Sequence, residues 1–320
     1  MTSRFHPDLA AAADLPRVPV RVEDLPTIQA IEPIALHAPA DVEIVDVDAT
    51  GAAGAPPVRL RVYRPAARAQ DTPALYWMHG GGYLAGSLES DDPIAIDIVR
   101  RLGIVVVSVR YRLAPAHPAP AALDDAYSGL AWVFRNASDL GVDPDRIAIG
   151  GGSAGAGLAA ALAQLTHDRA EYRPVFQLLV EPMLDDRTAV RTDIDLTFVR
   201  GWEAESNRLA WEAYLGQPPG MEHAPEYVVP ARRKDLSGLP PAWMGVGTLD
   251  LFFDEDLEYA RRLELAGVPC ETHIVPGAFH GFESIFPDAQ VSKSFVTTAV
   301  DALAVALGVG GRSSTTPSSW

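Results

Sequence analysis

The strongest constraint on the fold is a regular alternation of short apolar segments with helix-length segments. Eight segments are rich in β-branched or alternating apolar residues and are predicted to be strands: residues 41–49, 58–65, 74–79, 103–110, 146–150, 175–181, 242–247 and 270–275. From residue 74 onward, helix-length segments lie between or after the strands, at about 93–102, 119–136, 153–168, 254–266 and 288–307. Strands that alternate with helices and are apolar on both faces form a parallel sheet covered on both sides. We therefore predict an α/β fold with about eight mostly parallel strands flanked by helices.

Three parts of the chain depart from this alternation. The first two strands are joined by "TGAAGAPP" (50–57), which is typical of an antiparallel hairpin at a sheet edge. Residues 1–40 are short amphipathic pieces broken by prolines, and residues 183–230 contain the amphipathic run "GWEAESNRLAWEAYLG". An insertion after the sixth strand lies at the carboxyl ends of the strands, where open α/β sheets bind ligands.

These departures predict a domain organisation. We expect residues 1–40 and 183–230 to form a helical cap over a core made of residues 41–182 and 231–308. The tail, residues 309–320, is rich in glycine and serine and is predicted to be disordered.

The stretch "DRIAIGGGSAGAGLAA" (145–160) places a glycine-crowded turn between the fifth strand and a helix. The first, third and last glycines of "GGGSAG" (150–155) satisfy G-x-G-x-x-G, the turn that seats a pyrophosphate on a helix N-terminus. The same run satisfies G-x-S-x-G around Ser153, the nucleophile elbow. A dinucleotide turn normally follows the first strand, whereas this turn follows the fifth. Glu181, which closes the next strand, keeps the dinucleotide interpretation open, but the downstream residues favour a nucleophilic serine.

A nucleophilic serine needs a base, because its hydroxyl is a poor nucleophile until the proton is removed. After an elbow of this kind the chain order is serine, then an acid, then histidine. Asp250 follows the strand at 242–247 and His280 follows the strand at 270–275, so both are expected at the same sheet edge as Ser153. Asp254 is the alternative acid, although it begins the helical run "DEDLEYARRL", where a role as N-cap is expected.

The motif "HGGGY" (79–83) directly follows the third strand. Glycines at this place allow the backbone N–H groups of Gly80 and Gly81 to point into the site, together with that of Ala154. We predict that these three N–H groups stabilise an oxyanion. His79 is expected to shape this loop rather than to titrate.

Composition excludes several other kinds of function. The net charge of −16 disfavours nucleic acid and anionic membranes as partners. No apolar stretch approaches the roughly 20 residues that span a bilayer, and the N-terminus lacks the pattern of a signal peptide, so a cytoplasmic protein is predicted.

Cofactors and metals are not predicted either. The single cysteine, Cys270, excludes an internal disulfide and a multi-cysteine metal site, and no His/Asp/Glu cluster has the spacing of a metal site. The expected partner is a small-molecule ester, and a monomer and a homodimer both remain open.

Taken together, these motifs resemble the hormone-sensitive-lipase-like branch of the α/β-hydrolase superfamily, the bacterial family IV esterases. The resemblance covers about residues 73–308 and includes "HGGG" (79–82), "YRLAPAHPAPAALDDA" (111–126), "GGSAG" (151–155) and "HGF" (280–282). It implies an α/β-hydrolase fold with a helical cap. It also implies ester hydrolysis by Ser153, Asp250 and His280 through an acyl-enzyme intermediate.

Three positions depart from the family pattern. Gly152 precedes the serine where the family usually has Asp or Thr, which removes a side chain but no member of the triad. Leu251 follows Asp250 where the family reads Asp-Pro-Leu, and this keeps Asp254 open as the acid. Ala116 replaces the usual glutamate of the "YRLAP" block.

The substrate is the least determined part of the prediction. The resemblance implies short- to medium-chain acyl esters, and the candidates for lining an acyl pocket are Tyr83, Trp202, Trp211, Phe279 and Phe282. A lactone, a carbamate or an amide would use the same catalytic groups. Two alternatives come from other functional classes. One is an NAD-dependent oxidoreductase. The other is a ligand-binding receptor with this fold, and receptors of that kind lack the catalytic histidine.

Overall fold

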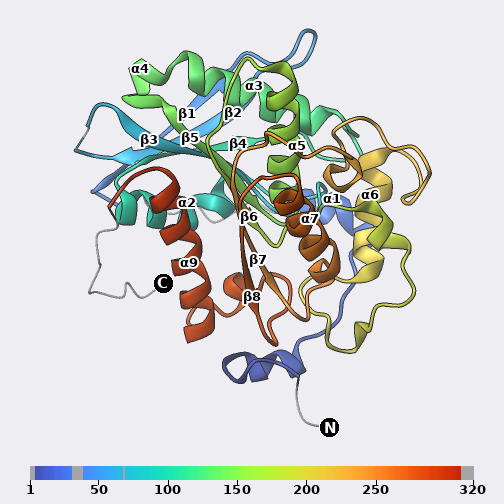
Figure 1. Cartoon of the computed structure of the whole chain (residues 1–320). Helices are drawn as coiled ribbons and strands as arrows, with labels where there is room; N and C mark the ends of the chain where they lie inside the picture. The colour runs from blue at the N-terminus through green and yellow to red at the C-terminus, as the bar shows by residue number, and fades with distance from the viewer. Residues whose placement is uncertain (1–3, 31–38, 68, 311–320) are drawn as a thin grey trace.

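The computed structural model describes residues 4–30, 39–67 and 69–310, and one mixed sheet forms its centre (Figure 1). The strand order is β1-β2-β4-β3-β5-β6-β7-β8. The strands are β1 (Val42–Ala49), β2 (Val58–Pro65), β3 (Thr72–Met78), β4 (Val105–Arg110), β5 (Val142–Gly152), β6 (Gln177–Val180), β7 (Ala242–Gly247) and β8 (Cys270–Val275). β2 is antiparallel to both β1 and β4, and every other pairing is parallel. The predicted fold class is therefore confirmed, including the antiparallel hairpin at one edge.

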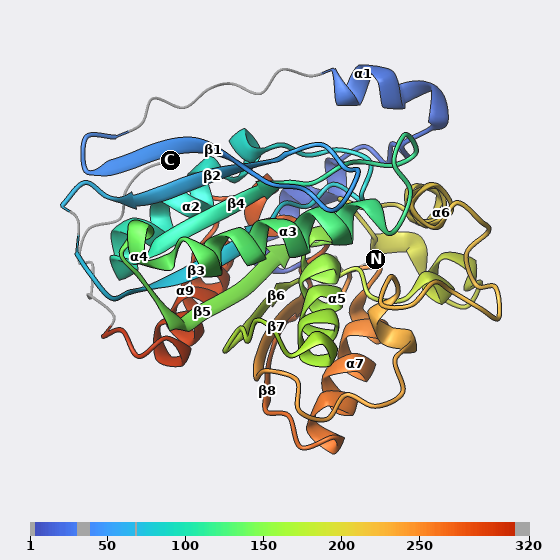
Figure 2. The ribbon, with the colours of Figure 1, turned by 90° about the horizontal axis from the view of Figure 1, so that it is seen from above.

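Helices cover both faces of this sheet (Figures 1 and 2). One face packs against α3 (Ala121–Arg135), α5 (Ala154–Arg169) and α7 (Phe253–Leu265), and the other against α2 (Leu88–Leu102) and α9 (Gln290–Ala306). Along β3 the buried side chains alternate, with Tyr76 in the first core and Trp77 in the second. This alternation is why the strand is apolar at every position. α4 (Ala137–Leu140) follows α3, and α8 (Phe282–Ile285) precedes α9.

The helix after the glycine-rich turn packs closely on the sheet. Residues 154–166 of α5 are all buried, and most of them are alanine or glycine. Small side chains let a helix approach its neighbours closely, so the start of α5 is fixed against β3 and β5.

One helix boundary differs from the prediction. α2 begins at Leu88, whereas the sequence predicted a start near residue 93. The Ser87 hydroxyl accepts a hydrogen bond from the Ser90 N–H and caps the helix, and Pro93 lies inside it. A proline inside a helix leaves one carbonyl of the preceding turn without its usual partner, but it does not remove the cap.

The N-terminal segment and the insertion after β6 lie against each other. The first contains the 3₁₀ helices Pro7–Asp14 and Val22–Asp24 and then α1 (Leu25–Gln29). The insertion contains the 3₁₀ helices Asp186–Val190 and Leu196–Phe198 and then α6 (Ala204–Leu215), and the 3₁₀ helix Pro230–Arg232 follows. Arg17 pairs with Glu203 at 2.9 Å, and the Val20 N–H donates to the Ser206 hydroxyl at 2.8 Å.

Two predictions concern membrane helices and the C-terminal tail. No helix among the described residues is both long and apolar enough to cross a bilayer. The tail that the sequence predicts to be disordered lies outside the described residues from residue 311 onward.

Candidate active site

Three loops at the carboxyl edge of the parallel strands bring together the serine, the histidine and the aspartate singled out by the sequence. Ser153 follows β5, Asp250 follows β7 and His280 follows β8. The Ser153 Oγ lies 2.9 Å from His280 Nε2, and His280 Nδ1 lies 2.8 Å from Asp250 Oδ2. Because a carboxylate only accepts hydrogen bonds, Nδ1 carries the proton, and Nε2 is left to accept the hydroxyl proton of the serine.

The backbone at Ser153 is strained, as an exposed serine on a sharp turn requires. Its φ is +54° and its ψ is −121°, a conformation that residues with side chains rarely adopt. Two glycines of the turn, Gly151 and Gly155, leave no room for a side chain. A Cβ on Gly155 would lie 2.0 Å from the Met78 carbonyl oxygen, and one on Gly151 would lie 2.4 Å from the Gly155 carbonyl carbon. A Cβ on Gly152 would meet nothing within 4 Å, so the departure from the family at this position has no steric cause.

The structure also distinguishes the two candidate acids. The Asp250 side chain is fully buried, and its Oδ1 accepts the Phe252 N–H at 2.9 Å. Asp254 lies at the surface, where it pairs with Arg191 at 2.7 Å. Asp254 is also not the N-cap of α7, because that helix already begins at Phe253. Only Asp250 is within hydrogen-bond distance of the histidine.

The electrostatics of the histidine suit a base. Burial alone would lower the pKa of His280, but the charge of Asp250, its hydrogen bond and the charge of Glu283 together raise that pKa above its usual value. The carboxylate therefore stabilises the imidazolium that forms when the ring takes a proton. The Phe252 ring packs edge-on against the imidazole, with 5.1 Å between ring centroids.

The loop after β3 lies directly beside the serine. A Cβ on Gly80 would lie 3.5 Å from the Ser153 Cβ. Among the described residues, the N–H groups of Gly80 and Gly81 have no hydrogen-bond acceptor. Ala154 is the first residue of α5, where an N–H has no partner within the helix. These three N–H groups are therefore available to an oxygen atom bound next to Ser153.

His79 holds this loop in shape. Its Nδ1 lies 2.8 Å from the Gly80 carbonyl oxygen, and its ring stacks on Tyr111 with 4.1 Å between centroids. The Tyr111 hydroxyl donates to the His79 carbonyl at 2.7 Å. Burial lowers the pKa of His79 to about 4, so the ring is neutral at ordinary pH. This placement agrees with a structural role.

A further carboxyl group lies at this site, and it was not predicted from the sequence to take part in hydrolysis. Glu181 follows β6, and its Oε2 lies 3.6 Å from His280 Nδ1. The position at the end of a central strand marks it as facing the same edge, but its side chain could not be oriented from the sequence.

Three side chains at this site have ligand atoms close enough together to be considered as a metal site. In the part of the chain that the structure describes, the Glu181, Asp250 and His280 donor atoms lie within 4.8 Å of one another. All three are buried, and the His280 Nδ1 proton already occupies the position between the ring and Asp250. The hydrogen bonds described above already account for the close approach of Asp250 and His280. No metal or cofactor is therefore assigned to these three side chains.

The five aromatic candidates for an acyl pocket separate into three groups. Phe279 and Phe282 have no exposed surface and pack in the core, against Phe5 and Phe295 respectively. Tyr83 and Trp211 are also buried, and Tyr83 stacks on Tyr214. Trp202 is the one of the five that is only half-buried.

Trp202 and the preceding Gly201 connect the insertion to the loop after β3 and to the loop that carries His280. A Cβ on Gly82 of the oxyanion loop would lie 2.3 Å from the Trp202 ring, and a Cβ on Gly201 would lie 1.9 Å from the His280 carbonyl oxygen. The Trp202 Nε1–H donates to the Asn207 side chain at 3.3 Å. The segment Gly201–Trp202 thus packs on the oxyanion loop and on the histidine loop at once.

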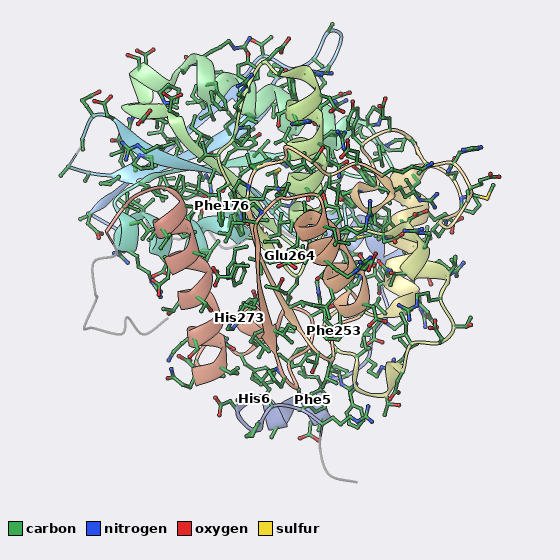
Figure 3. All side chains as sticks on the ribbon, in the orientation of Figure 1. Phe5, His6, Phe176, Phe253, Glu264 and His273 are labelled. Atoms are coloured by element: carbon green, nitrogen blue, oxygen red, sulfur yellow. The ribbon has the colours of Figure 1, made fainter. Side chains whose placement is uncertain are left out.

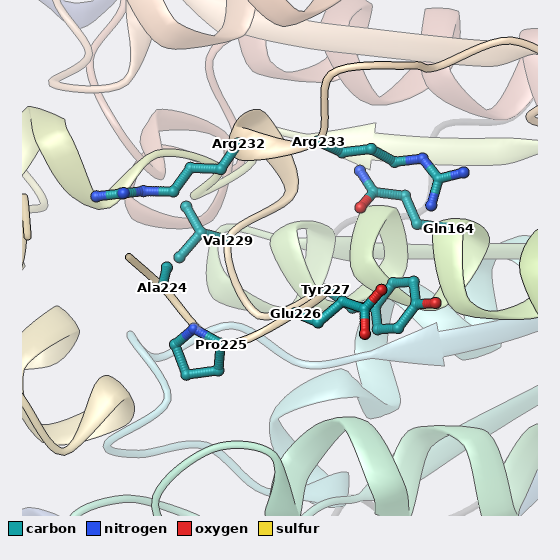
Figure 4. Close-up of a pocket in the computed structure, with 8 residues that line it drawn as sticks. All are labelled: Gln164, Ala224, Pro225, Glu226, Tyr227, Val229, Arg232 and Arg233. Atoms are coloured by element: carbon teal, nitrogen blue, oxygen red, sulfur yellow. The ribbon is translucent and has the colours of Figure 1, made fainter. Parts of the chain in front are cut away.

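Two cavities lie elsewhere. One, of about 230 Å³, is lined by Gln164 of α5 and by residues 224–233, and Figure 4 shows the Arg232, Arg233, Glu226 and Tyr227 side chains around it. The second, of about 470 Å³, lies between Arg187 and Arg262. Neither Ser153 nor His280 lines either of these two cavities.

Comparisons with known proteins show a similar fold and relatives named as ester hydrolases. Residues 75–284 match a family model described as alpha/beta hydrolase fold. The chain is 38% identical over 232 residues to the carboxylesterase NlhH of Mycobacterium tuberculosis, covering 70% of this chain and 71% of the relative. It is 33% identical over 252 residues to an ethyl acetate hydrolase of Pseudomonas putida, covering 76% and 77%. The solved structure of a bacterial heroin esterase superposes with a TM-score of 0.85 at 35% identity and covers 95% and 98% of the two chains.

Proposed function

The chain belongs to the hormone-sensitive-lipase-like esterases of the α/β-hydrolase superfamily, and from this premise we propose that Ser153, His280 and Asp250 are its catalytic triad. The protein is a carboxylic ester hydrolase. The observation that carries the assignment of the triad is the chain of contacts from Ser153 Oγ through the imidazole to Asp250, at 2.9 and 2.8 Å.

The first half of the reaction acylates the serine. His280 Nε2 takes the hydroxyl proton while Ser153 Oγ attacks the ester carbonyl, and the negative oxygen of the tetrahedral intermediate accepts hydrogen bonds from Gly80, Gly81 and Ala154 N–H. When the intermediate collapses, His280 gives its proton to the leaving alcohol. Asp250 stabilises the imidazolium throughout and keeps the proton on Nδ1.

The second half frees the acid. A water molecule gives its proton to His280 Nε2 and attacks the acyl carbonyl, and the same N–H groups hold the second oxyanion. The imidazolium then returns the proton to Ser153 Oγ as the acid leaves. The residues use no cofactor in either half.

The proposed substrates are esters with short- to medium-chain acyl groups. Two observations support this choice: the relative whose name specifies ethyl acetate acts on a short ester, and the half-buried Trp202 ring lies over the oxyanion loop. The N-terminal segment and the insertion, which contact one another and approach the site at Trp202, are proposed to be the cap. Lactones, carbamates and amides are alternatives that would use the same groups.

Covalent labelling tests the proposal. A fluorophosphonate is expected to modify Ser153 stoichiometrically, as mass spectrometry of the tryptic peptide would show, and to abolish hydrolysis of p-nitrophenyl acetate. Ser153→Ala is expected to lose labelling together with essentially all turnover, a fall of about 10⁶-fold in kcat by analogy with other serine hydrolases. Full turnover by Ser153→Ala would reject the triad.

The two alternatives from other classes, a ligand-binding receptor and an NAD-dependent oxidoreductase, do not fit a chain whose relatives are carboxylesterases. The remaining alternatives concern the substrate. A series of p-nitrophenyl esters of increasing acyl length, followed by a lactone, a carbamate and an anilide, then ranks the substrate classes by kcat/KM.

A further inference from the structure

Glu181 is a buried carboxyl group at the active site for which the reaction described above has no use. It directly follows β6 and is 2% exposed. Its φ is +47°, so it is one of three described residues at the site, with Ser153 and Tyr83, that adopt a positive φ without being glycine. Such strained conformations persist only where the surrounding structure holds them, and they concentrate at functional sites.

The backbone on both sides of Glu181 holds the serine. The Ser153 N–H donates to the Val180 carbonyl at 2.8 Å, and the Met183 N–H donates to the Ser153 carbonyl at 3.1 Å. Glu181 is itself held in place, because its N–H donates to the Gly245 carbonyl of β7 at 2.8 Å. The position of this short segment therefore sets the position of the nucleophile.

The side chain of Glu181 holds the histidine loop. The N–H of Gly281, the residue after His280, donates to Glu181 Oε2 at 2.5 Å. The same oxygen lies 3.6 Å from His280 Nδ1. One residue thus connects the backbone that fixes the serine with the loop that carries the base.

The surroundings of this carboxyl group are acidic. The titratable groups around it are Asp250 after β7, Asp256 on α7, Glu283 on α8 and His280 itself. Among the described residues, no lysine or arginine forms an ion pair with Glu181, and Asp250 already neutralises a protonated His280. Burial, and then the charges of Glu283 and Asp250, raise the pKa of Glu181 well above its usual value.

We propose that Glu181 is a positioning residue of this active site and that it acts as a neutral carboxylic acid. Its carboxyl oxygen accepts the Gly281 N–H and so fixes the imidazole of His280 between Asp250 and Ser153. The inference rests on the proposed function, because it assigns Glu181 a part in orienting the base of that triad.

Two substitutions test it through kcat and KM separately. Glu181→Gln keeps an oxygen for the Gly281 N–H and is neutral, so kcat is expected to stay within about threefold of the wild type. Glu181→Leu keeps the volume but removes the acceptor, and kcat is expected to fall about 10- to 100-fold with KM within twofold, because misplacement of a catalytic group slows the chemical step. Loss of kcat in Glu181→Gln to the same extent as in Glu181→Leu would overturn the proposal, and so would an unchanged kcat in Glu181→Leu.

The pH profile tests the protonation state and does not depend on whether Glu181→Leu folds. If Glu181 is neutral, the acidic limb of kcat/KM in Glu181→Gln coincides with that of the wild type. If Glu181 were ionised, removing a negative charge 3.6 Å from the ring would lower the pKa of His280 and shift that limb downward by about 1–3 units. Such a shift would reject the neutral acid.

Leu178→Ala is the matched control. Leu178 lies on the same strand but packs in the core on the opposite side of the sheet, so this variant is expected to lower Tm without lowering kcat. A parallel loss of kcat in Leu178→Ala would show that general destabilisation explains the result for Glu181→Leu and would overturn the positioning role. Failure of wild-type Ser153 to react with the fluorophosphonate would instead reject the proposed function, whatever the Glu181 variants do.

Discussion

The strand edge that carries the proposed triad and the insertion that packs on it are held in different ways. At the strand edge, Ser153 is fixed by backbone hydrogen bonds to residues 180 and 183 and by glycines in close contact with β3. The insertion has one helix of three turns, α6, and several short 3₁₀ turns, and it is joined to its surroundings by ion pairs such as Arg191–Asp254. Exposed ion pairs contribute only about 0–1 kcal/mol each, so the insertion is anchored mainly by the buried side chains of α6, Trp211, Tyr214 and Leu215, which pack in the core.

The strand edge and the insertion therefore have different proposed roles. In the proposed mechanism, the close-packed edge sets the geometry of bond making, which tolerates errors of less than about 1 Å. The insertion contacts the loops that carry Gly82 and His280 through Trp202 and Gly201, and its proposed role is to select among substrates. The substitutions below test this division, beginning with the largest expected effect.

Asp250→Asn is expected to lower kcat about 10³- to 10⁴-fold, because an amide no longer holds the His280 proton on Nδ1. Asp254→Asn, at the surface four residues later, is the matched control and should stay within twofold. Steady-state hydrolysis of p-nitrophenyl acetate measures both. Equal losses in the two variants would contradict the assignment of the buried aspartate as the acid.

Gly155→Ala is expected to destabilise the edge, because its Cβ would lie 2.0 Å from a backbone oxygen of β3. Overpacking of this kind costs about 1–3 kcal/mol, which lowers Tm by about 2–10 °C in a chain of this size. Gly152→Ala, where a Cβ meets nothing within 4 Å, should leave Tm and kcat nearly unchanged. Thermal unfolding followed by circular dichroism compares them, and similar values of Tm would show that the turn is not close-packed.

The pH dependence of kcat/KM tests the electrostatics of the edge. The neutral imidazole is the form that accepts the serine proton, and the carboxylate of Asp250 outweighs burial and raises the pKa of His280. The acidic limb is therefore expected above the usual histidine value of about 6.5, with activity falling about tenfold per pH unit below it. A titration from about pH 5 to about pH 9 measures the midpoint, and a midpoint below the usual value would contradict the prediction.

Trp202→Ala tests the insertion and should have the smallest effect on chemistry. The ring lies over the oxyanion loop, so its removal is expected to raise kcat/KM for longer acyl chains relative to acetate by about fourfold per methylene newly accommodated. Trp132→Ala, at another half-buried tryptophan on α3, is the control and should leave this ratio unchanged. An unaltered chain-length preference in Trp202→Ala would remove Trp202 from the proposed pocket.

Side-chain orientation limited what could be predicted about the substrate. Aromatic residues near the motifs could be named from the sequence, but nothing local distinguishes a core ring from a pocket ring. Phe279 and Phe282 flank the histidine motif and are nevertheless buried against Phe5 and Phe295, which come from the two ends of the chain. Figure 3 shows the N-terminal segment that carries Phe5 lying below β8 and α9.

The sequence also does not show which way the side chains of β8 point. The ring of His273 in this strand lies half-exposed between Trp243 and Phe295, on the face that α9 covers (Figure 3). The contacts of Glu181 could not be predicted from the sequence either. Its partner Gly281 is far along the chain, and its side-chain direction depends on a positive φ that glutamate rarely adopts.

The sequence by itself determined the strands and helices, the fold class, and the placement of Ser153, Asp250 and His280 at the ends of parallel strands. These features depend on periodicity and on glycine at tight turns, which are local properties, and on the rule that strands alternating with helices run parallel. Only the tertiary structure decided which aspartate meets the histidine, which aromatic rings are buried, and that Glu181 lies between the Ser153 turn and the loop that carries His280. Those relations depend on contacts between residues far apart in the chain, and such contacts exist only after the sheet has assembled.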